Sequence, residues 1–243
     1  MDADVEIGAY SLVGAGVELH AGCRVGPHVV IRGPCRVGAG TRIYQFASIG
    51  DDPQDKKYKG EPTRLEIGER NTLREYVTIN RGTAQDEGVT RVGNDNWIMA
   101  YAHIAHDCHV GSHTIFANGA TLAGHVEIGD HAVLGGFTLV HQFCRIGEHA
   151  FTAYGARINK DVPPFVRVSE GRSRPRGINT EGLKRRGFDE AALRQLREAY
   201  RILYRSELTL DAAIERLLAF EQTAPVIAPL RRFVQNRERS ILR

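Results

Sequence analysis

Histidines gather in three short stretches of the chain: AHIAHDCH at residues 102–109, AGHVEIG at 123–129 and HQFCRIG at 141–147. Imidazole titrates near neutral pH and can take a proton from a hydroxyl group as a general base. The first stretch holds Asp107, a carboxylate that could orient an imidazole and favour its protonated form. The second holds Gly124, whose backbone N–H could stabilise a developing oxyanion. Acyl transfer uses this set of groups.

These stretches belong to a six-residue repeat of apolar side chains that covers most of the chain. Neither an α-helix nor an ordinary strand has this period, whereas hexapeptide repeats are typical of a parallel β-helix with three short strands per coil. The frequent glycines suit its tight corners. We therefore expect a left-handed parallel β-helix, with Thr152 as a break in the pattern and an interior built from Ile7, Val13, Leu19, Val25, Ile31, Val37, Ile43, Ile49, Ile67, Leu73, Ile79, Val92, Ile98, Ile104, Val110, Phe116, Leu122, Ile128, Leu134, Val140, Ile146 and Ile158.

In such a helix, residues about eighteen positions apart lie above one another by roughly 4.8 Å, the spacing between strands. His106, Gly124 and Gln142 then form one column, and Asp107 and His125 lie in the next. An imidazole, a glycine amide and a carboxamide therefore share one edge. The alternative interpretation is structural: the histidine caps a corner or contacts another subunit, the glycine turns the corner, and the glutamine stacks in a ladder.

Two polar segments, residues 51–64 and 81–91, interrupt the repeat. Long loops in a compact scaffold usually serve function. We therefore expect these excursions to take part in the site.

The chain divides near residue 159. Residues 1–159 carry the repeat, residues 160–178 are rich in Pro, Gly and Arg and are predicted to form a linker, and residues 179–243 show helical periodicity. We expect about three helices in this last part, one of them beginning after Thr209 with Asp211 in its first turn.

Charge changes sign at nearly the same boundary. Residues 1–156 hold 13 Lys and Arg against 18 Asp and Glu, whereas residues 157–243 hold 19 against 11. A basic tail indicates an acidic partner, such as nucleic acid, a phosphate ligand or an acidic protein. The alternative is a solvated helical face.

The cysteines and the N-terminal stretch indicate a cellular compartment. Cys108 and Cys144 lie two coils apart, beyond disulfide reach, and Cys23 and Cys35 fall on different faces. Four reduced thiols fit a reducing compartment. No apolar run is long enough to span a bilayer, and the start MDADVEIG does not have the features of a signal peptide, so we expect a cytoplasmic protein.

Six strings together resemble the bacterial UDP-N-acetylglucosamine 3-O-acyltransferase family: IYQFASIG (43–50), YKGEPTRLEIG (58–68), AHIAHDC (102–108), TLAGHVEIG (121–129), VHQFC (140–144) and INTEGLKRRGF (178–188). The likeness runs from about residue 5 to the C-terminus. Many acyltransferases share the hexapeptide prism, but they do not share the EGLKRRGF string that follows it here. The six strings are therefore specific when they occur together.

The resemblance implies a homotrimer with active sites between subunits. It implies transfer of a (3R)-3-hydroxyacyl chain from acyl carrier protein to the 3-hydroxyl of UDP-N-acetylglucosamine, the first step of lipid A biosynthesis. No metal or redox cofactor is implied, because the carrier brings the phosphopantetheine group. The basic tail would then meet a diphosphate and the acidic carrier. Nucleic acid is not expected as a partner, because no aromatic platform accompanies the arginines.

Residue roles follow from the resemblance. His106 is the expected general base, Asp107 its partner and the Gly124 amide the oxyanion donor. Arginine pairs hold phosphates through bidentate, charge-assisted bonds. Further expected contacts are those to the sugar, acyl and pantetheine groups from His103, His125 and Gln142, to the nucleotide sugar from Asp55 and Lys57, and to the uridine diphosphate from Asn179, Glu181, Arg185 and Arg186.

Two residues depart from the family pattern. Asn80 stands where many relatives have His, which raises the question of whether the acceptor carries a 3-hydroxyl or a 3-amine. Tyr154, twelve residues past Gln142, lies where the acyl groove ends in this family and where small residues admit longer chains. We expect Tyr154 to limit the enzyme to shorter acyl chains, since a bulky ring removes room for several methylenes. The alternative is that the ring packs outside the groove.

Other functions share parts of this pattern. A trimeric β-helical carbonic anhydrase would use histidines such as His103, His106, His109 and His125 as zinc ligands. A structural or ice-binding β-helix would show regular outward threonine ladders, but the outward positions here are mixed and charged. Acylation of a 3-amino UDP-sugar, or another nucleotide-sugar acyltransferase of the hexapeptide class, is the remaining alternative.

Overall fold

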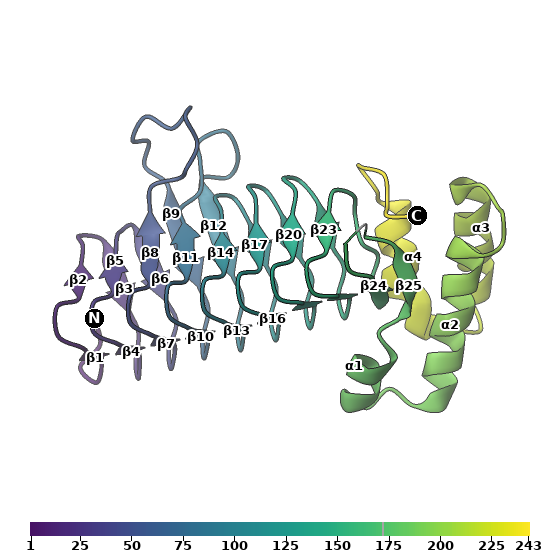
Figure 1. Cartoon of the computed structure of the whole chain (residues 1–243), viewed down its shortest axis with the longest axis horizontal. Coiled ribbons are helices and arrows are strands. Elements are labelled where there is room, and N and C mark those ends of the chain that lie inside the picture. Colours follow the sequence, from purple (N-terminus) through teal and green to yellow (C-terminus); the bar gives the residue numbers. More distant parts are fainter. Residues whose placement is uncertain (172) are drawn as a thin grey trace.

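The computed structural model describes residues 1–171 and 173–243. Short strands form the three sides of a long prism, with the N-terminus at one end and the helices at the other (Figure 1). The ten-stranded sheet contains β1 (Glu6–Ile7), β4 (Arg24–Val25), β7 (Arg42–Ile43), β10 (Thr72–Leu73), β13 (Trp97–Ile98), β16 (Ile115–Phe116), β19 (Val133–Leu134), β22 (Phe151–Thr152), β24 (Val166–Val168) and β25 (Pro175–Ile178). The eight-stranded sheet contains β2 (Leu12–Val13), β5 (Val30–Ile31), β8 (Ser48–Asp51), β11 (Thr78–Asn80), β14 (His103–Ile104), β17 (Thr121–Leu122), β20 (Leu139–Val140) and β23 (Arg157–Ile158). The seven-stranded sheet contains β3 (Val17–Leu19), β6 (Cys35–Val37), β9 (Arg64–Ile67), β12 (Val89–Val92), β15 (His109–Val110), β18 (Glu127–Ile128) and β21 (Arg145–Ile146).

The strand register confirms the predicted eighteen-residue coil. His103 pairs with Thr121 in the next coil, and Thr121 pairs with Leu139 in the coil after that. All these neighbours are parallel, as expected for the left-handed parallel β-helix. The sequence period therefore gives the vertical position of most residues in the prism.

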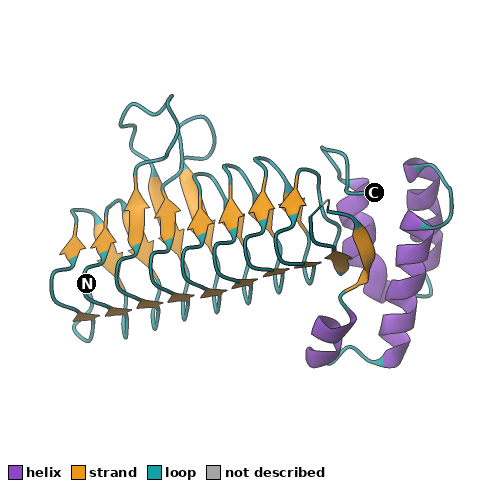
Figure 2. Ribbon diagram, viewed as in Figure 1, coloured by secondary structure: helices purple, strands orange, loops and turns teal. Residues whose placement is uncertain are grey.

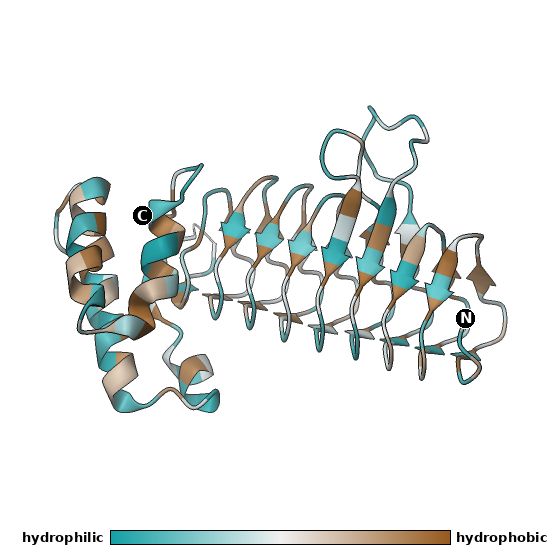
Figure 3. Ribbon diagram, turned by 180° about the vertical axis from the view of Figure 1, so that it is seen from behind, coloured by the Kyte–Doolittle hydropathy of each residue, from teal (hydrophilic) through white to brown (hydrophobic). Residues whose placement is uncertain are grey.

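The apolar repeat points into the prism. Ile98, Ile104 and Leu122 are completely buried, and burying one such side chain stabilises a fold by roughly 1.5–3 kcal/mol. Residues beside them on the two-residue strands point outward, so hydrophilic and hydrophobic segments alternate along the strands (Figure 3). The first coil is the exception, because 41% of the surface of Ile7 is exposed and Val13 is only half-buried.

Each coil has three corners, and most corners place a residue at a positive φ angle. The first corner joins the eight-stranded to the seven-stranded sheet and includes Asp107 (φ 57°) and His125 (φ 60°). The second corner follows the seven-stranded sheet and includes His131 and His149, and the third precedes the eight-stranded sheet and includes Phe137. These three corners are the long edges of the prism.

Both long loops leave the prism at the first corner. Residues 52–63 connect β8 to β9 and form the first loop, and residues 81–88 connect β11 to β12 and form the second loop. They project side by side from one edge (Figure 1). The loops therefore stand over the corner that carries His106 and Asp107.

The predicted linker, residues 160–178, is not an unstructured connection. β24 extends the ten-stranded sheet by pairing in parallel with β22, and β25 pairs antiparallel with β24. Val166 and Val168 are fully buried, so the inward alternation continues. The abundance of Pro, Gly and Arg in this segment hides that alternation in the sequence.

The tail folds into helices that close the end of the prism (Figure 2). They are α1 (Thr180–Arg185), α2 (Glu190–Tyr204), α3 (Leu210–Glu221), the short 3₁₀ helix η1 (Pro225–Ile227) and α4 (Ala228–Gln235). Thr209 caps α3 and Asp211 lies in its first turn, as predicted. None of the described helices is long and apolar enough to cross a membrane. All four cysteines are buried and free.

Candidate active site

The first corner brings His106 and Gly124 into direct contact. A Cβ added to Gly124 would lie 2.5 Å from Cε1 of the His106 ring, so only glycine fits below this imidazole. The His125 amide donates to the His106 carbonyl at 3.1 Å, and the Phe143 amide donates to the Gly124 carbonyl at the same distance. These bonds stack the successive coils at this edge and fix the ring above the glycine backbone.

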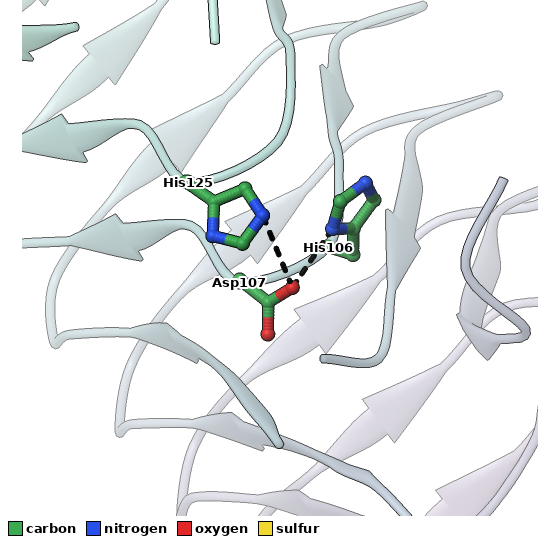
Figure 4. A group of neighbouring side chains, drawn as sticks. All are labelled: His106, Asp107 and His125. Atoms are coloured by element: carbon green, nitrogen blue, oxygen red, sulfur yellow. Dashed lines mark hydrogen bonds and ion pairs between the residues drawn. The ribbon is translucent and has the colours of Figure 1, made fainter. Parts of the chain in front are cut away.

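His106 forms a dyad with Asp107. Its Nδ1 lies 2.8 Å from Oδ2 of Asp107, whose side chain is 1% exposed (Figure 4). An ionised carboxylate can only accept, so Nδ1 carries the proton and the lone pair of Nε2 is available. This is the tautomer that a general base on a hydroxyl group requires.

The second loop supports the carboxylate from the other side. The Thr83 backbone N–H donates to Oδ1 of Asp107 at 2.8 Å, and Thr83 Oγ1 donates to Oδ2 at 2.7 Å. The Asp107 amide donates to Thr90 Oγ1 at 2.8 Å. Burial acts to raise the pKa of Asp107, but the hydrogen bonds from His106 and Thr83 outweigh it and lower that pKa. Asp107 therefore stays ionised beside the imidazole.

His125 lies on the next coil between two carboxylates. Its Nδ1 is 2.8 Å from Oδ2 of Asp86 in the second loop. Its Nε2 is 3.7 Å from Oδ2 of Asp107, the pair joined by a dashed line in Figure 4. The ring stacks on Phe143 with centroids 4.4 Å apart and meets His106 edge-on at 5.2 Å. The His125 ring therefore links the second loop to the dyad.

A backbone donor lies next to the dyad. Within the described parts of the chain, no backbone carbonyl accepts from the Gly124 N–H. The amides on either side of it do have acceptors, because Ala123 donates to the Val140 carbonyl and His125 donates to the His106 carbonyl. A free N–H beside a neutral imidazole can hold an oxyanion while the imidazole moves a proton.

His103 and Gln142 flank this centre. His103 lies on β14, three residues before His106 in the same coil, and its Nδ1 lies 2.6 Å from Thr78 Oγ1. Burial, with a smaller effect from His106, lowers the pKa of His103 and keeps it neutral. Gln142 is exposed, and its carbonyl accepts from Arg239 at 3.2 Å. His103 thus lies on the strand that leads into the first corner, and Gln142 lies in the column of His106 and Gly124.

Other predicted contacts lie on different parts of the chain. Asp55 and Lys57 are in the first loop, where the Lys57 amide donates to the Asp55 carboxylate at 2.9 Å. The remaining group surrounds α1 at the second corner: Asn179 donates to the His149 carbonyl at 3.1 Å, Glu181 and Arg185 are exposed, and Arg186 is half-buried with a pKa lowered by burial. A single chain therefore does not bring the α1 group to the His106 edge.

Tyr154 lies at the third corner, between β22 and β23, in the column of Gly136. Its Cδ2 atom is 3.4 Å from the place where a Gly136 Cβ would be, and its ring meets Phe137 at 5.8 Å in a T-shaped arrangement. The residue is 66% exposed. Tyr154 and His106 are thus on different edges of the same prism.

Asn80 is buried next to the first loop. It is 5% exposed, and its Nδ2 donates to the Asp52 carbonyl at 2.9 Å. The Asn80 side chain therefore anchors the first loop to the prism.

The histidines considered as zinc ligands do not converge. His109 lies on the seven-stranded sheet, where its Nε2 is 3.1 Å from an Arg91 nitrogen, and His103 faces Thr78. His106, Asp107 and His125 do place one potential ligand atom each within 4.8 Å of one another. In the described structure these atoms are used by the hydrogen bonds and ion pairs above.

Sequence reasoning missed Thr83, Thr90 and Asp86. The polar segment 81–91 indicated a functional loop, but no spacing within it singled out these positions. The feature of the sequence that pointed to these residues was the interruption of the six-residue repeat by this segment.

Two known families match parts of the chain. The family described as UDP N-acetylglucosamine O-acyltransferase, domain 2, matches residues 161–242, and the bacterial transferase hexapeptide family, with six repeats, matches residues 90–124. The two matches fall on the helical end and on the coils that carry the dyad.

Relatives match the whole chain. A protein of Herminiimonas arsenicoxydans named acyl-(acyl-carrier-protein)–UDP-N-acetylglucosamine O-acyltransferase is 59% identical over 100% of this chain and 94% of its own length. A protein of the same name from Thiobacillus denitrificans is 58% identical over 99% of this chain and 93% of its own length. The solved UDP-N-acetylglucosamine O-acyltransferase of Moraxella catarrhalis is 42% identical with a TM-score of 0.98, covering 100% of this chain and 94% of its own.

Proposed function

The chain belongs to the UDP-N-acetylglucosamine O-acyltransferase family, and from this premise we propose how its residues transfer an acyl group from acyl carrier protein to UDP-N-acetylglucosamine. The reaction starts lipid A biosynthesis. The relatives are named O-acyltransferases, which favours a sugar hydroxyl over a 3-amino group as the acceptor. We take the acceptor to be the 3-hydroxyl and the donor to carry a (3R)-3-hydroxyacyl thioester.

The observation that carries the mechanism is the contact between the His106–Asp107 dyad and the Gly124 backbone. In the first step, His106 Nε2 takes the proton of the sugar 3-hydroxyl while its oxygen bonds to the thioester carbonyl carbon. The carbonyl electron pair moves to oxygen, and the Gly124 N–H holds the resulting oxyanion. Asp107 stabilises the imidazolium formed at His106.

The intermediate then collapses. The carbon–oxygen double bond reforms, the carbon–sulfur bond breaks, and the imidazolium of His106 returns the proton to the departing pantetheine thiolate. The products are the O-acyl nucleotide sugar and the free thiol of the carrier. Neither step requires a metal or a redox cofactor, since the phosphopantetheine arrives attached to the carrier.

Substrate contacts complete the proposal. Asp55 and Lys57 reach the nucleotide sugar from the first loop, and His103, His125 and Gln142 border the sugar, acyl and pantetheine groups. The uridine diphosphate is held by Asn179, Glu181, Arg185 and Arg186.

The placement of these groups supports a homotrimer. The dyad is at the first corner, the α1 group is at the second and Tyr154 is near the third, so one prism cannot direct all of them at one substrate. Neighbouring copies packed with parallel axes would bring different edges together. The basic tail, with 19 Lys and Arg against 11 Asp and Glu, would receive the acidic carrier protein. An acyl carrier donor and four free, buried thiols favour the cytoplasm as the location.

The experiment that tests this function is incubation of the purified protein with UDP-N-acetylglucosamine and 3-hydroxyacyl carrier proteins of graded chain length. We expect an ester at O3 of the sugar, formed without added metal, and a preference for the shorter chains. Absence of an ester product with every donor would reject the proposed function. If only a 3-amino UDP-sugar is acylated, to give an amide, then the acceptor group is this amine and not the 3-hydroxyl.

A further inference from the structure

The first loop is tied to the prism through a buried arginine that belongs to the second loop. Arg81 follows β11 and is only 7% exposed, although it is flanked by two loops that project from the prism. Burying a guanidinium away from water costs several kcal/mol unless its N–H groups find partners. The partners of Arg81 therefore indicate what this charge does.

Those partners lie on two different structures. One terminal nitrogen, Nη1, donates to the carbonyls of Gly50 at 2.7 Å and Gly33 at 3.1 Å, both on the prism. The other, Nη2, bonds to the Asp52 carboxylate and lies 3.1 Å from the Tyr58 hydroxyl, both in the first loop. The planar fork thus joins the loop to the coil beneath it, a geometry that the single ammonium of lysine does not reproduce.

The first loop has few other connections to the prism. Its internal bonds run from the Tyr58 amide to the Asp55 carbonyl, from the Tyr58 hydroxyl to the Glu61 carbonyl, and from the Lys59 amide to the Glu61 carboxylate. These bonds shape the loop but do not orient it. Orientation comes from Asn80, which donates to the Asp52 carbonyl at 2.9 Å, and from Arg81.

Asp55 and Lys57 lie between the two loop residues that Arg81 holds, Asp52 and Tyr58. We propose that Arg81 is a positioning residue that fixes the first loop where Asp55 and Lys57 meet the nucleotide sugar. Because those two contacts are part of the proposed function, the inference rests on it. Arg81 itself does not touch substrate.

The test compares Arg81→Lys with wild type by two measurements. In hydrogen exchange of the protein without substrate, the amides of Lys57, Tyr58 and Lys59 exchange at least about tenfold faster in Arg81→Lys, since bonds to a charged group are lost. In steady-state acyl transfer, KM for UDP-N-acetylglucosamine rises about tenfold or more, while kcat and KM for the acyl carrier protein change less than about threefold.

Two further variants make the comparison specific. Asp52→Asn weakens the ion pair between Arg81 and the first loop but keeps the bonds of the Tyr58 hydroxyl, and we expect smaller shifts in the same direction. Arg42→Lys changes an exposed arginine on the ten-stranded sheet and leaves both measurements as in wild type. If Arg81→Lys does not fold, the Asp52→Asn result decides.

Unchanged loop exchange in folded Arg81→Lys, or an equal fall of kcat with no rise in the KM of the nucleotide sugar, would overturn the inference. Failure of the proposed function has a different signature. Wild type would then form no ester, and the exchange measurement, which needs no substrate, would still report on Arg81.

Discussion

Asp107→Asn tests the tautomer assigned to His106, because the surrounding donors dictate how the new amide can sit. The Thr83 backbone N–H, 2.8 Å from Oδ1, can only donate and must therefore face the amide oxygen of an asparagine. The amide nitrogen is then forced into the place of Oδ2, 2.8 Å from His106 Nδ1. Thr83 Oγ1 can rotate to accept from the same nitrogen.

An amide nitrogen donates, so it holds His106 Nδ1 as an acceptor and places the proton on Nε2. The base then has no lone pair toward the sugar hydroxyl. Serine hydrolases in which an aspartate orients the catalytic histidine lose about 10⁴ in kcat on the same change, and we expect a fall in kcat on the order of 10³–10⁴-fold. KM for both substrates should change little, since the shape of the site is kept.

The assay is steady-state ester formation, with thermal unfolding as the check that the variant is folded. Thr83→Val is the matched control, because it removes one hydrogen bond to Asp107 but leaves the carboxylate and the correct tautomer. We expect the control to lose only about tenfold in kcat. A folded Asp107→Asn enzyme within tenfold of wild type would refute the role of Asp107 as the residue that orients His106.

Three further outcomes are expected. Gly124→Ala places a Cβ 2.5 Å from the His106 ring and should lower kcat by about 10²-fold with the fold intact; a fall below threefold would contradict the close contact. Tyr154→Gly should shift the preferred acyl chain to longer donors in a graded carrier assay, and an unchanged preference would show that the ring packs outside the groove. Burial, with smaller effects from His131 and Arg186, lowers the pKa of His149 from 6.5 to about 4. The unfolded chain therefore binds this proton first, and the free energy of unfolding should fall as the pH drops from about 6.5 to about 4; in denaturant unfolding at several pH values His149→Phe should show a smaller fall, and an identical pH dependence would exclude this residue as the cause.

The site was predictable where the repeat is unbroken. An eighteen-residue coil places His106 above Gly124, and the register of β14 with β17 agrees. The same arithmetic places Tyr154 twelve residues beyond Gln142, which is two corners further round the coil. Sequence alone could therefore show that these residues occupy different edges of one prism.

Loop contacts were not predictable, because an insertion has no period. Thr83 reaches Asp107 and Asp86 reaches His125 because of the conformation of the second loop, which no repeat in the sequence specifies. The strands β24 and β25 were missed for another reason: Pro, Gly and Arg dominate the composition of residues 160–178, while two buried valines supply the inward pattern.

The most direct measurement is kcat for acyl transfer to UDP-N-acetylglucosamine by His106→Ala compared with wild type. Loss of the general base should lower kcat by about 10²–10⁴-fold while the protein stays folded. A folded His106→Ala enzyme that turns over at nearly the wild-type rate would contradict the assignment of His106 as the base.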